Sequence, residues 1–370
     1  MTLAYSKRLV VKIGSALLID DASNAIRYNW MRALSDDIAE IRNRGTEIVI
    51  VSSGAIGAGR SILNLGRKPL KLEEKQAAAA TGQIRLAHAW QETLAKHDIP
   101  LAQILLTPSD TEERRRHLNA RTTIETLLDL KAVPLINEND TVATEEIRFG
   151  DNDRLAARVA QMITADTLVL LSDIDGLYTS NPRKDPNAVF VPEVTELTAE
   201  IVGMADAAAP GNSSGGMVTK IAAADIAMRA GCQVIITDGR PEHSLCNFQN
   251  QGRYTRFVPA ESSANARKRW IAGAVNQGGK FIVDEGAALA LGQGGSLLPV
   301  GVKSVDGIFD RGDTVTIYNL AGARLGCGIS AYCSEDARLI AGRNSGEIEG
   351  LLGYRGRAEM IHRDNLVLEI

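Results

Sequence analysis

A glycine-rich segment that ends in a lysine contains the residue types that bind phosphate. It reads Ser214-Gly215-Gly216-Met217-Val218-Thr219-Lys220 and opens a stretch with apolar residues at the helical period. Backbone N–H groups at a helix start carry partial positive charge, and Lys220 adds a full one. The spacing is not that of a Walker A loop. We expect a phosphate-binding helix start; the alternative is a glycine-rich loop before an ordinary core helix.

A second lysine interrupts an apolar strand. Lys12 lies near the carboxyl end of Leu9-Val10-Val11-Lys12-Ile13-Gly14-Ser15, which reads as a buried strand running into a tight turn. Ligands of doubly wound sheets bind beyond the carboxyl ends of the strands. Lys12 is therefore a candidate phosphate ligand, and the alternative is an edge lysine whose amine reaches water.

Polar side chains gather where other strands should end. Asn137-Glu138-Asn139-Asp140 follows the apolar segment 133–136, and Phe149-Gly150-Asp151-Asn152-Asp153 precedes a helix. Such groups could hydrogen-bond an ammonium, a hydroxyl or a carboxylate group. The alternatives are a polar turn for the first group and helix capping for one aspartate of the second. Ser172-Asp173 follows a further apolar strand.

The loop after the second apolar strand, residues 52–59, contains three glycines that could present N–H groups to an anion. Their order is G-x-x-G-x-G, whereas dinucleotide-binding folds use G-x-G-x-x-G. The acidic pair Glu73-Glu74 lies in an alanine-rich helical stretch and not at a strand end. This pattern argues against a nicotinamide-dependent dehydrogenase.

Strand-like and helical segments alternate as far as about residue 260, which predicts an α/β fold with an open, mostly parallel sheet sandwiched by helices. Expected strands include residues 48–51, 101–106, 168–171 and 232–236. From residue 280 short strand-like pieces and glycine-rich turns predict a small β-rich domain.

Length and composition set further limits. A chain of 370 residues is expected to form about two domains, and a net charge of −4 gives no general attraction to nucleic acid or acidic membranes. The four cysteines form no C-x-x-C pair and the five histidines lack metal-ligand spacing. There is no signal-type or transmembrane stretch. A cytoplasmic protein with reduced thiols is expected.

The order of these motifs along residues 9–240 resembles the glutamate 5-kinase family of the amino acid kinase superfamily. Asn-Glu-Asn-Asp and Gly-Asp-Asn-Asp are the more specific motifs, whereas S-G-G-M-x-x-K is shared across the superfamily. The tail resembles a PUA domain through Val283-Asp284-Glu285-Gly286-Ala287 and Ser296-Leu297-Leu298-Pro299. The resemblance implies an amino acid kinase domain at 1–260, a linker at 261–277, a PUA domain at 278–356 and a C-terminal tail at 357–370.

The resemblance implies that ATP with Mg²⁺ phosphorylates the γ-carboxylate of L-glutamate, in the first step of proline biosynthesis. By motif, Lys12 and Lys220 would flank the transferred group and Asp153 would hold them. The implied glutamate-binding residues are Ser53, Gly54, Asn137, Asp140 and Asn152. The implied nucleotide-binding residues are Lys12, Ser172, Asp173, Ser214, Gly215, Gly216, Met217, Val218, Thr219 and Lys220. Ser172 stands where the family often has threonine, which keeps the hydroxyl.

The implied chemistry agrees with the residue types. A carboxylate is already a nucleophile at neutral pH, so no general base is needed, and the enzyme must position two anions and offset their charge. Two lysines, backbone N–H groups and Mg²⁺ could do this. Because Mg²⁺ can be held by phosphates and water, no protein ligand to the metal is expected.

Other members of the superfamily remain alternatives, namely N-acetylglutamate kinase, aspartokinase and uridylate kinase. A non-catalytic RNA-binding PUA protein is another, but residues 278–370 contain nine Lys and Arg against twelve Asp and Glu, which disfavours RNA. The resemblance also implies proline as an inhibitor, a homodimer or homotetramer, and functional coupling to glutamyl phosphate reductase. The polar segment 141–148 is a candidate effector-sensing loop.

Overall fold

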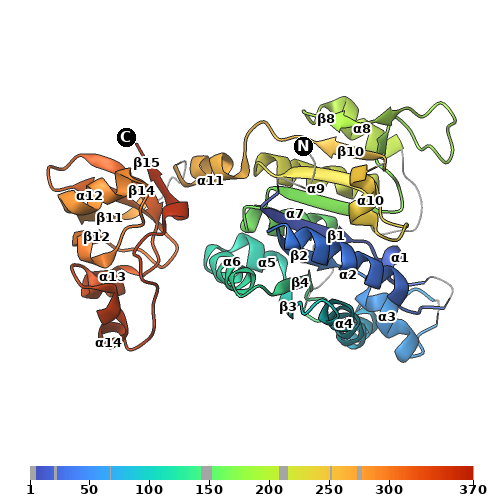
Figure 1. Ribbon diagram of the computed structural model, residues 1–370, viewed down its shortest axis with the longest axis horizontal. Helices are drawn as coiled ribbons and strands as arrows, with labels where there is room; N and C mark the ends of the chain where they lie inside the picture. The colour runs from blue at the N-terminus through green and yellow to red at the C-terminus, as the bar shows by residue number, and fades with distance from the viewer. Residues whose placement is uncertain are drawn as a thin grey trace. The chain divides into compact units, whose positions relative to one another are not determined.

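The computed structural model describes residues 6–20, 23–66, 68–142, 152–207, 216–250, 252–272 and 277–369. The chain divides into two compact units, residues 1–263 and 264–370 (Figure 1). Of the segment expected to be a linker, Ser263–Ala272 form helix α11. Among the described residues no helix is long and apolar enough to cross a membrane, and all four cysteines are free thiols.

The first unit is built on an eight-stranded sheet with the order β3-β4-β2-β1-β5-β9-β10-β8. The pairs between β3, β4, β2, β1, β5 and β9 are all parallel, whereas β10 is antiparallel to β9. The strands are β1 (Arg8–Ile13), β2 (Glu47–Ser52), β3 (Leu101–Leu106), β4 (Val133–Glu138), β5 (Thr167–Ser172), β8 (Glu193–Val194), β9 (Gln233–Asp238) and β10 (Tyr254–Phe257). The predicted mostly parallel sheet is confirmed.

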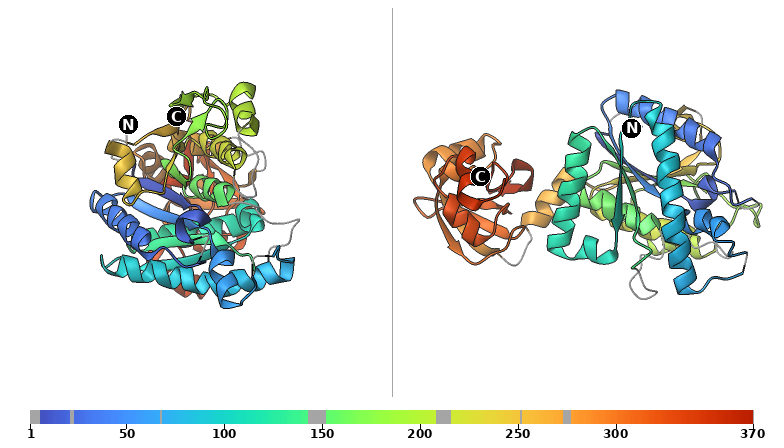
Figure 2. Two further views of the ribbon diagram at one scale, coloured as in Figure 1. Left: turned by 90° about the vertical axis from the view of Figure 1, so that its right-hand side faces the viewer. Right: turned by 90° about the horizontal axis from the view of Figure 1, so that it is seen from below.

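Helices cover both faces of this sheet (Figure 2). Side chains of successive residues in a strand point to opposite faces, so near-continuous apolar strands supply two buried clusters. The first cluster includes side chains from α2, α3, α4 and α10, and the second includes side chains from α6, α7, α8 and α9. These helices and the two remaining ones are α1 (Ser15–Leu18), α2 (Tyr28–Asn43), α3 (Ala55–Ile62), α4 (Leu72–Ala95), α5 (Pro108–Glu112), α6 (Arg114–Asp129), α7 (Asn152–Met162), α8 (Ala199–Ala207), α9 (Met217–Arg229) and α10 (Ser244–Asn250).

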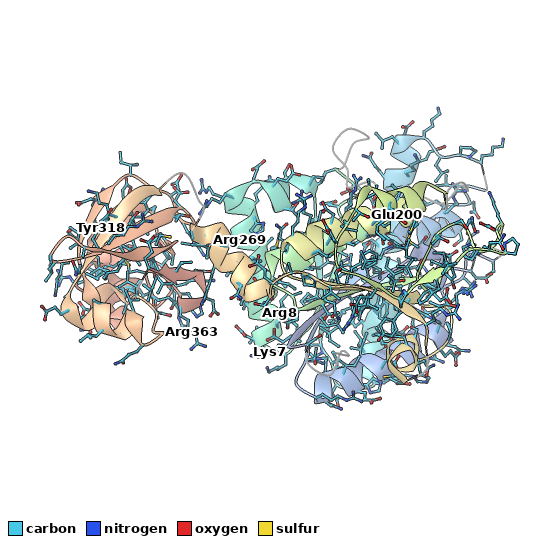
Figure 3. All side chains as sticks on the ribbon, turned by 90° about the horizontal axis from the view of Figure 1, so that it is seen from above. Lys7, Arg8, Glu200, Arg269, Tyr318 and Arg363 are labelled. Atoms are coloured by element: carbon cyan, nitrogen blue, oxygen red, sulfur yellow. The ribbon has the colours of Figure 1, made fainter. Side chains whose placement is uncertain are left out.

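The amino-end edge of the sheet is held by charged contacts. Arg8 begins β1 and its guanidinium contacts the Glu47 carboxylate at 2.7 Å. The backbone N–H groups of Lys7 and Arg8 donate to Asp166 Oδ2 at 2.8 and 2.9 Å. Figure 3 labels Lys7 and Arg8. These contacts fix where β1, β2 and β5 start, and parallel pairing then brings their carboxyl ends to one edge.

The predicted loop or hairpin at residues 181–192 is a hairpin. Strands β6 (Leu177–Tyr178) and β7 (Phe190–Val191) pair antiparallel, with Leu177 opposite Val191. The rings of Tyr178 and Phe190 pack edge to face with centroids 5.4 Å apart. This hairpin follows β5 and ends at residue 191, just before β8 begins at residue 193.

The second unit has its own five-stranded sheet, with the order β12-β11-β13-β14-β15, and its own apolar cluster. Phe281 and Phe309 pack edge to face at 5.6 Å within that cluster. The β-rich character expected from the sequence is confirmed. Its strands are β11 (Gln277–Val283), β12 (Val302–Gly307), β13 (Thr314–Asn319), β14 (Arg324–Ile329) and β15 (Leu366–Leu368), and its helices after α11 are α12 (Glu285–Gly292), η2 (Pro299–Gly301), α13 (Ser334–Ile340), η3 (Ser345–Glu347), α14 (Ile348–Leu352) and η4 (Arg363–Asn365).

Helices α3 and α4 touch through backbone at two glycines. A Cβ atom placed on Gly59 would lie 1.8 Å from the Ala78 carbonyl oxygen, and one placed on Gly82 would lie 1.8 Å from the Ala55 carbonyl oxygen. Neither position tolerates a methyl group without moving a helix. The contact therefore fixes α4 against the start of α3.

We predict that Gly82→Ala destabilises the protein. Overpacking a close contact typically costs about 1–3 kcal/mol, which should outweigh the gain in helix propensity of about 1 kcal/mol. The matched control is Gly203→Ala in α8, where a Cβ meets nothing within 4 Å. Urea unfolding should show Gly82→Ala below wild type and Gly203→Ala at or above it. Equal stability of the two variants would contradict the close contact.

Candidate active site

Lys12 lies in β1 and its side chain faces α7 and α9. The neighbouring Leu9, Val11 and Ile13 belong to the cluster under α2 and α4, whereas Val10 belongs to the other cluster. Because strand side chains alternate, Lys12 shares the face of Val10. It is only 7% exposed, so the alternative of an edge lysine reaching water is wrong.

Asp153 joins the two predicted lysines. Its Oδ1 lies 2.5 Å from Lys12 Nζ, and its Oδ2 lies 3.2 Å from Lys220 Nζ. Thr219 also donates its hydroxyl to Asp153 Oδ2 at 2.8 Å. The carboxylate is fully buried and both lysines are nearly so. Residues separated by more than 200 positions in the sequence therefore meet in one ionic cluster, which we call the lysine–aspartate cluster (Lys12, Asp153, Lys220).

The carboxyl of Asp153 remains ionised despite its burial. Desolvation raises its pKa, but the charges of Lys12 and Lys220, with hydrogen bonds from Lys12 and Thr219, lower the pKa to about 2. The carboxylate therefore stays charged throughout the physiological range. It keeps the two ammonium groups at fixed positions.

Helix α9 begins inside the predicted phosphate-binding segment. Gly216 is its N-cap in an extended conformation, and Met217, Val218 and Thr219 form its first turn. Thr219 lies at the third helical position, and its hydroxyl oxygen is also 2.8 Å from the Gly216 carbonyl oxygen, so two acceptors share its one hydrogen. Gly231, which follows the C-cap Ala230, has φ +73°, the left-handed conformation typical of a glycine that ends a helix. Ser214 and Gly215 lie outside the described residues.

The predicted acceptor-binding residues meet at the amide of Asn152. Its Nδ2 lies 2.8 Å from Ser53 Oγ, 2.9 Å from Asn137 Oδ1 and 3.0 Å from the Ser52 carbonyl oxygen. Asn137 in turn donates from Nδ2 to Gln83 Oε1 at 2.7 Å. Three of the predicted residues are thus brought together, with Gln83 as a fourth member that the sequence did not reveal.

Gly54 and Asp140 flank this group in the chain. Gly54 caps α3 with φ +96°, a conformation that favours glycine, and its Cβ position would be 3.2 Å from the Ile19 side chain. Asp140 is half-buried in the turn two residues after β4. Asp151 and the effector-loop residues 143–148 lie outside the described residues.

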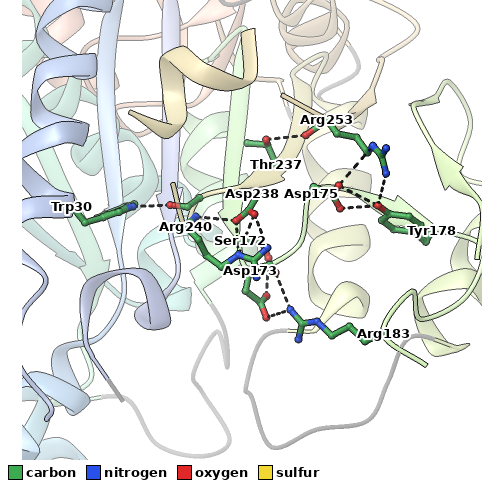
Figure 4. Close-up of polar contacts among 11 residues, drawn as sticks. Trp30, Ser172, Asp173, Asp175, Tyr178, Arg183, Thr237, Asp238, Arg240 and Arg253 are labelled. Carbon is green, nitrogen blue, oxygen red and sulfur yellow. Dashed lines mark hydrogen bonds and ion pairs between the residues drawn. The ribbon is translucent and has the colours of Figure 1, made fainter. Parts of the chain in front are cut away.

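Ser172 ends β5 and Asp173 follows it, between this strand and the hairpin (Figure 4). Arg183 in the hairpin loop reaches back and donates to the Asp173 carbonyl oxygen at 2.9 Å and to its carboxylate at 3.0 Å. Partial burial raises the pKa of Asp173, but the hydrogen bond and charge of Arg183 outweigh it and lower the pKa overall. On β9, opposite Ser172, Asp238 is held by Arg240.

All these residues lie at the carboxyl-end edge of the parallel strands. Ligands bind at this edge in doubly wound sheets. The lysine–aspartate cluster and the α9 start offer positive charge there, which suits phosphate. The Asn152 group offers amide and hydroxyl groups, which suit a small polar acceptor.

Comparison with known proteins matches one family model to each of the two units. Residues 7–238 match the model of the amino acid kinase family, and residues 279–352 match the PUA domain. A glutamate 5-kinase of Paramagnetospirillum magneticum is 59% identical over 99% of both chains. The chain belongs to the amino acid kinase family, among its glutamate 5-kinases. Another glutamate 5-kinase, from Rhodospirillum rubrum, is 57% identical over 97% of this chain and 96% of its own length.

A solved structure supports the fold of the first unit. A carbamate kinase from Giardia lamblia bound to AMP-PNP superposes with a TM-score of 0.50 at 16% identity, covering 69% of this chain and 99% of that one. The chain therefore shares its fold with that kinase over most of its length. At this identity the likeness concerns the fold alone.

Two contacts of the candidate site were not expected from the sequence. Gln83 is a buried amide residue on the apolar face of α4, between Ala79 and Leu86, and a polar residue at a core position of a helix is the signal that could have found it. Arg183 lies in a loop, and its contact with Asp173 depends on the path of the hairpin, which no spacing rule gives.

We predict that Asp153→Asn destabilises the fold by about 3–5 kcal/mol, the usual cost of removing one partner of a buried ion pair. In the wild type a lowered pKa means that this contribution is present above the unfolded value of 3.8 and is lost as pH falls through about 2. Urea unfolding at pH 7 measures the change. A pH series should show that the variant lacks this acid-dependent component.

The matched control for this prediction is Asp173→Asn. Asp173 also pairs with a cation, but its side chain is 57% exposed. Exposed pairs contribute about 0–1 kcal/mol. If Asp153→Asn cost no more stability than Asp173→Asn, the lysine–aspartate cluster would not be the structural centre described above.

Proposed function

We propose that this chain transfers the γ-phosphoryl group of ATP to the side-chain carboxylate of L-glutamate, giving L-glutamyl 5-phosphate for proline synthesis. The observation that carries the proposal is the start of α7. Asn152 contacts Ser53 and Asn137, while the next residue, Asp153, holds the two lysines. The first turn of α7 therefore joins the polar residues suited to the acceptor to the lysine–aspartate cluster suited to phosphate. The glutamate 5-kinase relatives support glutamate as the acceptor.

In the proposed reaction a glutamate carboxylate oxygen forms a bond to the γ-phosphorus, and the bond from that phosphorus to the β-bridging oxygen breaks, releasing ADP. No proton needs to move, because the acceptor is already ionised. Lys12 and Lys220 would flank the transferred group and offset the charge that accumulates there. Asp153 would act on the two lysines, holding both in the orientation that phosphate needs.

The residues present fit ATP. Two buried lysines contact one carboxylate, so the lysine–aspartate cluster is positive overall and favours an anion. The first turn of α9, with Gly216, Met217, Val218 and Thr219, would bind phosphate through backbone N–H groups, together with Ser214 and Gly215. Ser172 and Asp173 would lie at the nucleotide. Mg²⁺ would reduce repulsion between the two anions, and we propose that phosphates and water hold it.

On the acceptor side, Ser53, Gly54, Asn137, Asp140 and Asn152 would bind glutamate. Hydroxyl and amide groups can donate to its carboxylates, and the Asp140 carboxylate can accept from its ammonium group. In this proposal the phosphate side of α7 is positively charged, whereas the acceptor side has hydroxyl and amide groups and the Asp140 carboxylate. This difference would keep glutamate from binding at the phosphate position.

We further propose that the kinase domain comprises residues 1–260 and that a linker at 261–277 leads to the PUA domain at 278–356. All proposed site residues lie in the first unit, so the chemistry should not require the second. A cytoplasmic location, a homodimer or homotetramer, and delivery of the acyl phosphate to glutamyl phosphate reductase complete the proposal. The acidic tail argues against RNA as a partner.

The test of the proposed reaction is a hydroxamate assay with purified full-length protein, MgATP and hydroxylamine. L-Glutamate should give γ-glutamyl hydroxamate with a higher kcat/KM than N-acetylglutamate or aspartate. Lys220→Ala should lower kcat by about 10²–10³, the usual loss for one preorganised charge contact. Lys96→Ala, at the exposed C-terminus of α4, is the charge-matched control and should behave as wild type. Preference for another acceptor would contradict the assignment.

We also predict that proline inhibits by competing with glutamate. Proline offers the same α-carboxylate and an ammonium-type nitrogen, which Asp140 could pair. Initial rates at several glutamate concentrations, with and without millimolar proline, should show a raised KM and an unchanged kcat. A saturation curve that proline leaves unchanged would remove this part of the proposal.

A further inference from the structure

Helix α4 buries one amide side chain at the carboxyl-end edge of the sheet. Gln83 is 9% exposed and stands on the face that also buries Ala79, Leu86 and Trp90. A buried polar group is costly unless it is hydrogen-bonded. The partner of Gln83 is Asn137, whose Nδ2 lies 2.7 Å from Gln83 Oε1. The helix therefore places its single buried amide against a proposed glutamate-binding residue.

Strand β4 directs Asn137 toward this helix. Leu135 belongs to the same apolar cluster as Leu86 and Trp90, and alternation along the strand places Asn137 on the same face. Asn137 is 3% exposed, so both ends of its amide need partners within the protein. Gln83 takes the NH₂ end and Asn152 donates to the oxygen end at 2.9 Å.

The side-chain amides of Asn152, Asn137 and Gln83 form a hydrogen-bond relay in which each amide donates to the next one. Asn152 donates to Asn137, and Asn137 donates to Gln83. An amide turned by 180° occupies almost the same volume, but it would place the Asn137 NH₂ against the Asn152 NH₂, where neither can accept. The donor on Asn152 and the acceptor on Gln83 therefore both favour the observed orientation of the Asn137 amide. The same Asn152 NH₂ group also contacts Ser53 Oγ and the Ser52 carbonyl oxygen, so the Asn137 oxygen is one of three acceptors that surround it.

The position of Gln83 is itself fixed by the backbone. Gly82 packs against the Ala55 carbonyl so closely that a Cβ would be 1.8 Å away. About two turns later in α4, Trp90 donates to Ser52 Oγ at 3.4 Å. The helix is thus held to the end of β2 and the start of α3, the same segment that contains Ser53 and Gly54.

We propose that Gln83 is a positioning residue for the acceptor: it fixes the amide orientation of Asn137 and, through it, of Asn152. This inference rests on the proposed function, since it assigns the relay to glutamate binding. Gln83 acts through Asn137, so its loss should weaken glutamate binding and leave the nucleotide side intact. The lysine–aspartate cluster is held by separate contacts on the other face of the sheet.

The test compares Gln83→Leu with Thr93→Val in the full-length protein. Leucine removes the acceptor and keeps most of the volume. Thr93 is a buried polar residue of the same helix whose hydroxyl donates to the Trp90 carbonyl oxygen and not to the relay. We expect Gln83→Leu to raise KM for glutamate about tenfold, with kcat and KM for ATP within twofold of wild type. Thr93→Val should leave all three within twofold.

A second comparison separates positioning from packing. In an Asn137→Ala background the relay is already broken, so adding Gln83→Leu should change KM for glutamate by less than twofold. If Gln83→Leu does not accumulate in folded form, Gln83→Ala replaces it, with an expected rise of at least threefold. The inference is overturned if KM for glutamate stays within twofold of wild type, if KM for ATP rises equally, or if the full effect persists without Asn137.

The wild-type acceptor preference is measured first. If the wild type prefers an acceptor other than glutamate, the proposed function fails, and the same KM comparison with that acceptor still decides the role of Gln83. Failure of the relay with glutamate as the preferred acceptor would count against Gln83 alone.

Discussion

The rest of the site depends on the contact between Asp153 and the lysines Lys12 and Lys220. A buried carboxylate is unfavourable alone, and two buried ammonium groups repel each other, so the cluster is stable only with all members present. This requirement fixes β1, α7 and α9 relative to one another. Alanines of α7 and α9 lie in the same apolar cluster, which lets the helices approach closely enough for the contact. The charge arrangement thus constrains the packing as much as the packing constrains the charges.

Strand alternation divides the site in two. In β1 it directs Lys12 toward α7 and α9, and in β4 it directs Asn137 toward α4. The lysines suited to phosphate therefore lie on one face of the sheet, and the amide groups suited to the acceptor lie on the other. They meet at the carboxyl-end edge, where Asn152 reaches across to Ser53 and Asn137. A one-residue shift of register in either strand would reverse this assignment.

Much of this arrangement could be predicted from the sequence because it follows from local pattern. The strand expected at residues 101–106 is β3 itself, and the predicted start at Val133 is that of β4. Apolar periodicity does not reveal polar strand ends, so Asn137 and Glu138 were expected after the strand and lie within it. The contacts of Gln83 and Arg183 depend on how distant elements pack. Gly59 and Gly82 bring α3 and α4 into backbone contact. Apart from their being glycines, nothing in the sequence predicts this contact.

The consecutive positions of Asn152 and Asp153 explain why one rigid element serves both substrates. Successive residues of an α-helix point about 100° apart, so neighbours in the first turn of α7 can face two sites at a fixed separation. Phosphoryl transfer requires the acceptor oxygen and the phosphorus within contact distance and in line, and a displacement of about 1 Å is costly. A loop could vary that separation, whereas a helix turn packed against β1 and α9 does not. The ion pairs that hold Asp153 therefore also set the position of Asn152. The hydrogen bonds through Asn137 to Gln83 set the orientation of the Asn152 amide.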